Sequence, residues 1–285
     1  MGSSVSRCIR VSWLTRAIAS ATVATVLVAP IGDPVAAQFP GGRGAAPPAP
    51  SGRVGAPVDL TGTWVSVVTE DWLHRMVTPD KGDYTTVETV MNAQARKVAD
   101  SWDPSMDGRC EGYGVAGLMR LPTRLRISWQ DDVTLKIESD AGQQTRLLHF
   151  AKPGVAAPTA ASIASQPRTL QGYSVAAWVR SGGGEDAFLG GRVGAAGGTQ
   201  PWGSLKVVTT NMRPGWLRRN GVPYSQNTTL TEHFTRFTHP DAGDWFIVTS
   251  VVNDPTYLTQ PFITSSNFRR EPNDSKWNPV SCRAR

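Results

Sequence analysis

Short segments rich in β-branched and aromatic residues recur along most of the chain, and turn-forming residues separate them. Runs of this kind, bounded by Gly, Pro, Asn and Asp, are typical of β-strands. The predicted strands cover residues 60–68, 123–129, 133–139, 143–150, 172–180, 204–210, 228–237, 244–253 and 262–269. A chain that supplies many strands and few helices is expected to fold into an all-β structure.

Three of these strands are expected to form an antiparallel meander. Gln130-Asp131-Asp132 makes a hairpin loop between the first two, and Asp140-Ala141-Gly142 turns into the third. Apolar and polar residues alternate along the first strand, with Leu125, Ile127 and Trp129 on one face and Arg124, Arg126 and Ser128 on the other. The polar face is either the solvated exterior of a half-buried sheet, which we favour, or a polar barrel lumen.

Residues 90–102 contain the one credible helix outside the N-terminal segment. Met91, Ala95, Val98 and Trp102 recur at spacings of four, three and four residues, which places them on one apolar stripe. Asp103-Pro104 is expected to end the helix, because the residue before a proline disfavours helical geometry. The stripe is interpreted as packing against the sheet.

The N-terminus has the parts of a secretory signal. Three arginines precede the apolar run 17–30, and Val35-Ala36-Ala37 offers small residues for cleavage. The run is shorter than the roughly 20 residues that a membrane-spanning helix needs, so we expect no stable membrane anchor. We therefore expect a signal peptide at 1–37, a disordered Pro/Gly/Ala linker at 38–57, a single domain at 58–285, and a periplasmic or secreted location.

Removal of the signal peptide takes Cys8 away and leaves Cys110 and Cys282. In an exported chain an even number of cysteines favours a disulfide, and two free buried thiols are the alternative. The formal charge of +6 falls to about +4 in the mature chain, and no basic tract exceeds two residues. A nucleic-acid partner is therefore not expected, because such a surface needs concentrated positive charge.

Asp59-Leu60-Thr61-Gly62-Thr63-Trp64 opens the domain with a Gly-x-Trp motif, and strands in meander order follow. This pattern resembles the lipocalin-type barrels. The resemblance implies an all-β, mainly antiparallel barrel with one or two short helices, in which the tryptophan plugs the closed end. In that family a late-strand arginine often packs on the tryptophan, and Arg269 is the candidate here. The chain also resembles secreted proteins of environmental bacteria that carry similar DLTGTW, TLKIE, NGVPYS and DPxYLTxPF segments and have no established activity.

Three familiar chemical motifs are not supported. Gly112, Gly114 and Gly117 have dinucleotide-binding spacing, but Pro122 follows and no helix begins there, so we expect a loop. Ser174 lacks the second glycine of a nucleophile elbow. The four histidines, His74, His149, His233 and His239, form no metal-binding pattern, and we predict neither a metal nor a cofactor.

Polar segments at 70–75, 211–225 and 253–259 would line one mouth of a barrel. Candidate catalytic residues are Asp71, His74, Glu232, Asp254 and Tyr257, and candidate ligand-binding residues are Trp72, Arg75, Arg213, Trp216 and Tyr224. Glu232 lies among apolar neighbours, as a general acid or base often does, although an ion pair with Arg236 or another basic group is the alternative. Asp254 precedes a proline, so an Asx-type turn is its alternative.

These observations leave three hypotheses of function. The first is a protein that binds an apolar or aromatic small molecule, since an eight-stranded barrel has room for one. The second is a cofactor-independent acid–base enzyme, namely a lyase, isomerase or hydrolase. The third is a carbohydrate-binding module that uses exposed tryptophans such as Trp202 and Trp216. The sequence makes no prediction of oligomeric state.

Overall fold

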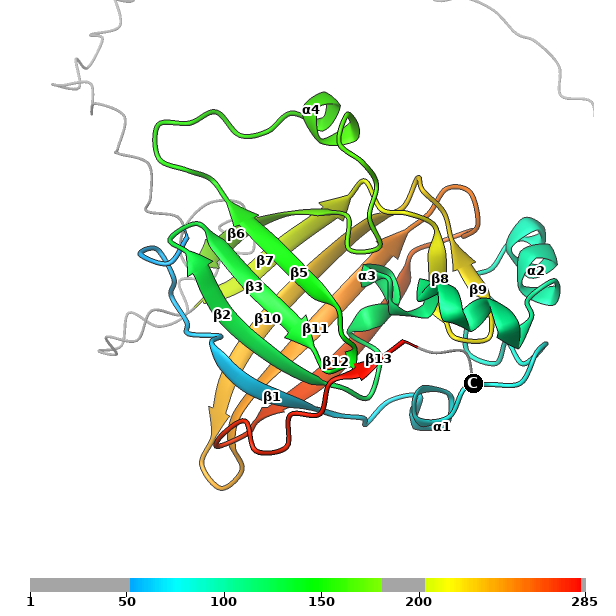
Figure 1. The fold of residues 1–285 in the computed structure, drawn as a ribbon, viewed down its shortest axis with the longest axis horizontal. Helices are drawn as coiled ribbons and strands as arrows, with labels where there is room; N and C mark the ends of the chain where they lie inside the picture. The colour runs from blue at the N-terminus through cyan, green and yellow to red at the C-terminus, as the bar shows by residue number, and fades with distance from the viewer. Residues whose placement is uncertain (1–51, 181–202, 283–285) are drawn as a thin grey trace, which may run out of the picture. The chain divides into compact units, whose positions relative to one another are not determined.

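The computed structural model describes residues 52–180 and 203–282 (Figure 1). The predicted signal peptide, most of the predicted linker and Trp202 lie outside the described residues. The chain divides into two compact units, 1–47 and 48–285, and all described residues belong to the second.

Within the described residues, nine strands close into a barrel. Their order around it is β1 (Gly62–Val67), β12 (Phe262–Arg270), β11 (Gly243–Asn253), β10 (Thr229–His239), β7 (Gly203–Thr210), β6 (Tyr173–Arg180), β5 (Thr145–Phe150), β3 (Thr134–Ser139) and β2 (Arg124–Asp131), which returns to β1. The prediction of an all-β, mainly antiparallel barrel is confirmed, and each predicted strand is present.

One strand pair departs from the expected antiparallel pattern. β5 and β6 run parallel, with Leu148 opposite Ser174. Parallel neighbours cannot be joined by a tight hairpin, because the chain must return to the end where the first strand began. The segment between them, which carries the short helix α4 (Ala160–Ala164), makes this return on the outside of the barrel (Figure 1).

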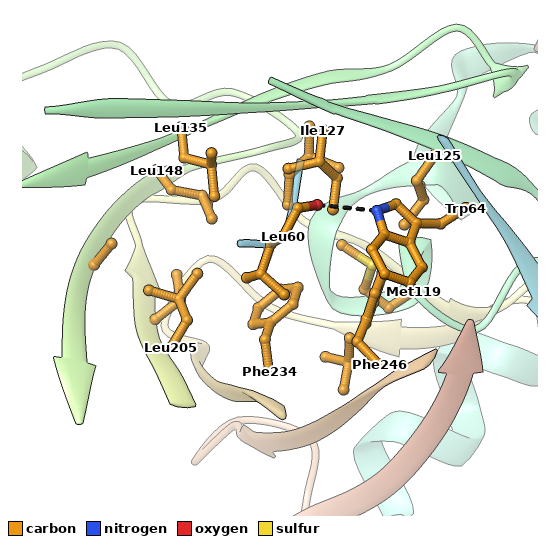
Figure 2. Packing of buried hydrophobic residues seen from close by; sticks show 14 of the residues in the cluster. Leu60, Trp64, Met119, Leu125, Ile127, Leu135, Leu148, Leu205, Phe234 and Phe246 are labelled. Carbon is orange, nitrogen blue, oxygen red and sulfur yellow. Dashed lines mark hydrogen bonds between the residues drawn. The ribbon is translucent and has the colours of Figure 1, made fainter. Parts of the chain in front are cut away.

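The barrel interior is filled with apolar side chains. Leu125 and Ile127 of β2 face inward and are almost fully buried, and Phe234, Phe246 and Phe268 pack together from neighbouring strands. Figure 2 shows many of these side chains converging. The apolar face of the meander therefore faces the core, and the favoured interpretation of the alternation is confirmed.

Trp64 lies at the centre of this packing. Its Nε1 donates a hydrogen bond of 2.9 Å to the Leu60 carbonyl (Figure 2), and its ring meets Phe246 edge-on at 4.7 Å between centroids. The guanidinium carbon of Arg270 lies 5.7 Å from the Trp64 ring centroid, whereas Arg269 lies over Trp245. The candidate Arg269 was therefore wrong by one residue, because successive side chains of a strand point to opposite faces.

The end of the predicted linker packs on the barrel. The Gly52 carbonyl accepts a 2.8 Å hydrogen bond from Trp178 Nε1, and the Arg53 amide donates one of 2.8 Å to the Asp132 carbonyl. Residues 52–57 thus belong to the folded unit, although their composition predicts a linker. Backbone hydrogen bonds to the barrel rim hold them there, and amino-acid composition does not report such bonds.

A cap covers the opposite end of the barrel (Figure 1). It consists of α1 (Trp72–Met76), α2 (Ala93–Asp100), α3 (Val115–Leu118), the 3-10 helices η1 (Pro104–Arg109) and η2 (Glu111–Tyr113), and the hairpin of β8 (Gly215–Arg218) and β9 (Val222–Tyr224). Helix α2 is the predicted helix, and the Asn92 side chain caps it by accepting from the Ala95 amide. A second apolar core lies between the cap and the barrel mouth and includes Leu217, Leu230 and Phe262.

Cys110 and Cys282 form a disulfide, as predicted, with 5.5 Å between their Cα atoms. The bond joins the cap to the C-terminal tail, in which β13 (Val280–Ser281) pairs in parallel with β4 (Ala141–Gly142). Across the part of the chain that the structure describes, no helix is long and apolar enough to cross a membrane.

Candidate functional site

Four arginines line a small cavity in the cap. Arg75 comes from α1, Arg120 follows α3, and Arg218 and Arg219 lie at the end of β8. The cavity has a volume of about 70 Å³, and His74, Met76, Val77 and Leu217 also line it. This space suits a few water molecules or one small polar group, since a single water needs roughly 10–15 Å³.

Asp71 is the anionic centre that holds the arginines together. Its Oδ2 lies 2.6 Å from Arg120 Nη2 and 3.0 Å from Arg218 Nη2, and its Oδ1 lies 3.1 Å from His74 Nδ1. Burial acts to raise the pKa of Asp71, but the His74 hydrogen bond and the charges of Arg218 and Arg120 outweigh it and lower that pKa. Asp71 is therefore ionised in the folded protein at neutral pH.

His74 lies between two carboxylates. Its Nδ1 faces Asp71 and its Nε2 lies 3.1 Å from Asp83 Oδ2. Only an imidazole protonated on both nitrogens can donate to both acids. This arrangement ties helix α1, which is only five residues long, to the loop that carries Asp83.

Arg75 is the least compensated of the arginines. It is 7% exposed, and its Nε donates a 2.8 Å hydrogen bond to the Arg120 carbonyl. Both terminal nitrogens, Nη1 and Nη2, are buried and have no hydrogen-bond partner among the described residues. Burial, together with the nearby charge of Arg120, lowers the pKa of Arg75 to about 10, against the opposing effects of Glu70 and Asp71.

Arg218 is also incompletely satisfied. Its Nη2 donates to Asp71 and to Thr86 Oγ1, whereas its Nε and Nη1 have no partner within the described residues. Burial lowers its pKa, and Asp71 opposes this effect. Asp71 is the acid in closest contact with the arginines, while Glu70 lies 3.8 Å from Arg120. The cavity wall therefore carries an excess of positive charge.

The structure brings together three of the sequence candidates, Asp71, His74 and Arg75. They come from the polar segment at 70–75, for which the sequence predicts functional residues. Trp72 of the same segment is 61% exposed and does not line the cavity.

The remaining ligand-binding candidates lie elsewhere in the cap. Trp216 and Tyr224 are buried, and the Trp216 Nε1 and Tyr224 hydroxyl have no partner among the described residues. Burial and the charge of Glu111 raise the pKa of Tyr224. Arg213 is exposed, and its amide donates to the Thr169 carbonyl. Because Trp216 is buried, its predicted role as an exposed carbohydrate-stacking residue is wrong.

Glu232 lies inside the barrel and forms an ion pair with Arg146, and both side chains are fully buried. Arg146 also donates to Ser174 Oγ at 3.2 Å and to Thr209 Oγ1 at 2.9 Å. The alternative interpretation of Glu232 as an ion-pair partner fits the structure, with Arg146 in place of Arg236. Arg236 instead lies 2.8 Å from Asp244.

Asp254 organises the turn that joins β11 to β12. Its carboxylate accepts hydrogen bonds from the Ser225 amide and hydroxyl, from Thr228 Oγ1 at 3.0 Å and from the Thr256 amide at 2.8 Å. The Asx-type alternative therefore fits this residue. Tyr257 packs against the apolar core under the cap. The five catalytic candidates do not share one cavity, because Glu232, Asp254 and Tyr257 are outside the one that His74 lines.

Sequence reasoning missed Arg120 and Arg218. Arg218-Arg219 is visible as a short basic tract, but nothing local distinguishes a buried arginine from an exposed one. Each reaches the cavity only through the fold, since residues 75, 120 and 218 come from separate parts of the chain.

Within residues 52–180 and 203–282, no group of three or more His, Cys, Asp or Glu side chains is placed to hold a metal ion. Comparison of the chain with protein-family models, with curated proteins and with solved structures finds no match in any of the three.

Proposed function

We propose that this chain is an exported binding protein that captures a small molecule through an anionic group, held in the arginine-lined cavity of the cap. The observation that carries this proposal is Arg75, whose two terminal nitrogens are buried without partners. An uncompensated buried charge costs several kcal/mol, so a site that keeps one is suited to an anion that supplies the missing contacts. A carboxylate or phosphate can accept two parallel hydrogen bonds from one guanidinium.

The location of the cavity supports a role in binding. The resemblance to lipocalin-type barrels assigns Trp64 to the closed end, and the cap lies at the other end (Figure 1). The barrel interior is filled by side chains such as Phe234 and Phe246, so the ligand site belongs to the cap rather than to the barrel lumen. The barrel then acts as a rigid scaffold for the site.

Export is supported by two features. The N-terminal segment has the charge and hydropathy pattern of a signal peptide. The Cys110–Cys282 disulfide is the kind of bond that persists in oxidising compartments such as the periplasm.

Binding is tested by thermal unfolding of the purified protein at constant ionic strength, with chloride replaced by acetate, phosphate or sulfate. A ligand at ten times its Kd stabilises the folded state by about 1.4 kcal/mol, which raises the unfolding temperature. We expect this increase in the wild-type protein and not in Arg75→Met.

Arg53→Met is the matched control, because Arg53 is exposed at the opposite end of the barrel, and it should respond like wild type. The proposal is wrong if no anion stabilises the wild-type protein more than Arg75→Met.

A second candidate is a cofactor-independent acid–base enzyme, favoured by one observation. His74 lines the same cavity and contacts two carboxylates, so an imidazole able to transfer protons lies beside the proposed anion site. The test is to identify the anion released from the native protein by mass spectrometry and to incubate it with wild type and His74→Gln. Conversion by the wild-type protein alone would favour the enzyme.

A further inference from the structure

A second, larger cavity lies beside the arginine-lined cavity. It has a volume of about 340 Å³, and its lining is mainly apolar: Val77, Thr78, Pro79, Asp80, Lys81, Trp102 and Pro104. The two cavities share Val77 and Thr78 in their walls. We call the second cavity the Trp102 groove.

The apolar surface continues between the two cavities. Met76 and Val77 are 53% and 59% exposed, and both line the arginine-lined cavity. Large apolar side chains exposed together in this way are a common feature of binding sites. A molecule that starts at Arg75 and passes Val77 would therefore remain on apolar surface until it reaches the groove.

Trp102 gives the groove a polar group of its own. The residue is buried, and its Nε1 has no hydrogen-bond partner among the described residues. A buried indole nitrogen usually finds an acceptor, so an unpartnered one indicates a place for a ligand atom. The ring is held by the β8–β9 turn, because Gly221 (φ +86°) packs so closely that an added Cβ would lie 2.3 Å from Trp102 Cβ.

We infer that the ligand is a small carboxylic acid with an apolar aliphatic or aromatic body, whose carboxylate binds Arg75 and whose body lies in the Trp102 groove. This inference rests on the proposed function and names its class of ligand. The two unpartnered terminal nitrogens of Arg75 match the two oxygens of a planar carboxylate. The prolines and Trp102 supply the apolar surface that buries the rest of the molecule.

The burial of the arginines favours a free acid over a lipid bilayer. Arg75 and Arg120 are each 7% exposed, and Arg218 is 4% exposed. Membrane-binding proteins attract anionic lipids through basic residues near the surface. Guanidinium groups that are enclosed in a cavity are reached by a single small molecule instead.

The first experiment measures the affinity of the purified protein for acetate, butyrate, hexanoate and 3-phenylpropionate by calorimetry at constant ionic strength. Burial of each added methylene in the groove should lower Kd about fourfold, which corresponds to about 0.8 kcal/mol. If acetate binds and longer acids bind no better, the inference is overturned and the proposed function stands. The inference is also overturned, and the proposed function stands, if phosphate binds and carboxylates do not.

The second experiment locates the apolar body with a pair of variants. Val77→Ser should weaken hexanoate binding several-fold more than it weakens acetate binding. Val54→Ser is the matched control, since Val54 is exposed near the opposite end of the barrel, and it should leave both affinities unchanged. Equal hexanoate affinity in the two variants would contradict a path over Val77.

The third experiment uses the indole N–H signals of ¹⁵N-labelled protein. The Trp102 signal, identified by its loss in Trp102→Phe, should shift with 3-phenylpropionate and remain in place with acetate. A Trp102 signal that moves with neither acid contradicts the inference. Binding to vesicles that contain phosphatidylglycerol, without binding of any free acid, also contradicts the inference. If neither carboxylates nor phosphate nor sulfate binds, the proposed function fails as well.

Discussion

Replacing Arg75 with methionine is expected to stabilise the ligand-free protein. The guanidinium is buried, its two terminal nitrogens have no partner among the described residues, and its pKa is lowered to about 10. Methionine fills the space of the aliphatic stem without a charge and adapts to irregular surroundings. The variant therefore removes the desolvation cost of the charge and keeps most of the packing.

The size of this effect follows from the pKa of Arg75. A pKa of about 10 lies more than two pH units below the ordinary range of arginine, and each unit equals about 1.36 kcal/mol. The charged form is thus disfavoured on folding by about 3 kcal/mol, which residual solvent screening reduces to about 2–3 kcal/mol. Loss of the hydrogen bond from Arg75 Nε to the Arg120 carbonyl costs about 1 kcal/mol. The expected net gain is about 1–2 kcal/mol.

The assay is thermal and urea unfolding of wild type, Arg75→Met and the control Arg53→Met in a chloride buffer without carboxylates or phosphate. For a domain of this size, the gain corresponds to an increase in unfolding temperature of about 2–8 °C. Arg53→Met should unfold close to wild type, because Arg53 is exposed. Addition of a bound acid should then stabilise wild type and Arg53→Met only.

A lower unfolding temperature for Arg75→Met would refute this reasoning. It would mean that Arg75 is satisfied in the ligand-free protein and serves to hold α1 against the loop at Arg120. The proposal of an anion site would then lose the observation that carries it. A stabilised variant that binds anions as tightly as wild type would also contradict the proposal, because anion binding would then not depend on Arg75.

Three further predictions concern the charges and the disulfide. Asp71→Asn should destabilise the protein by about 3 kcal/mol at pH 7, because it removes the ionised partner of Arg120 and Arg218. The folded pKa of Asp71 is lowered, so its contribution is present above about pH 4 and is lost as the pH falls through that pKa; the difference in urea unfolding should therefore shrink progressively below pH 4, and a difference that does not change with pH would contradict it. Glu232→Gln should destabilise the protein by about 3–5 kcal/mol, because it leaves Arg146 buried without its charged partner. Glu232→Leu combined with Arg146→Met should recover most of that lost stability in a double-mutant cycle, and additive losses would argue against the pair. Replacement of Cys110 and Cys282 by alanine should lower the free energy of unfolding by up to about 5 kcal/mol, from the loop-closure entropy of a sequence separation of 172 residues, and a reductant should have no effect on the variant.

The strands could be predicted because alternation and turn residues lie within short segments. The disulfide could be predicted because few cysteines are present. Alternation along β2 placed Leu125 and Ile127 on the core face, since side chains of a strand have a period of two. With Cys8 in the predicted signal peptide, two cysteines remain and allow one intramolecular pairing. The parallel pairing of β5 with β6 was not predictable in this way, because it depends on how a long connection returns across the barrel.

Part of the site was also visible in the sequence. The segment at 70–75 combines acids, a histidine and an arginine, and the structure places Asp71, His74 and Arg75 together. The interpretation of Glu232 as an acid–base residue drew on its apolar neighbours in sequence, whereas its partner Arg146 comes from a distant strand. A local pattern identifies which residues are polar, and it does not identify their partners.

Periodicity, turn residues and residue counts along the chain predict the strands, the buried face of the first meander, the helix within 90–102 and the cysteine pair. The tertiary fold alone brings Arg120 and Arg218 to Asp71 and places Arg75 in the wall of the same cavity. The reason is physical: a charge in a sequence has no defined environment until the fold encloses it. Closure of the barrel and docking of the cap bury these guanidinium groups, and their burial makes them a site for an anion.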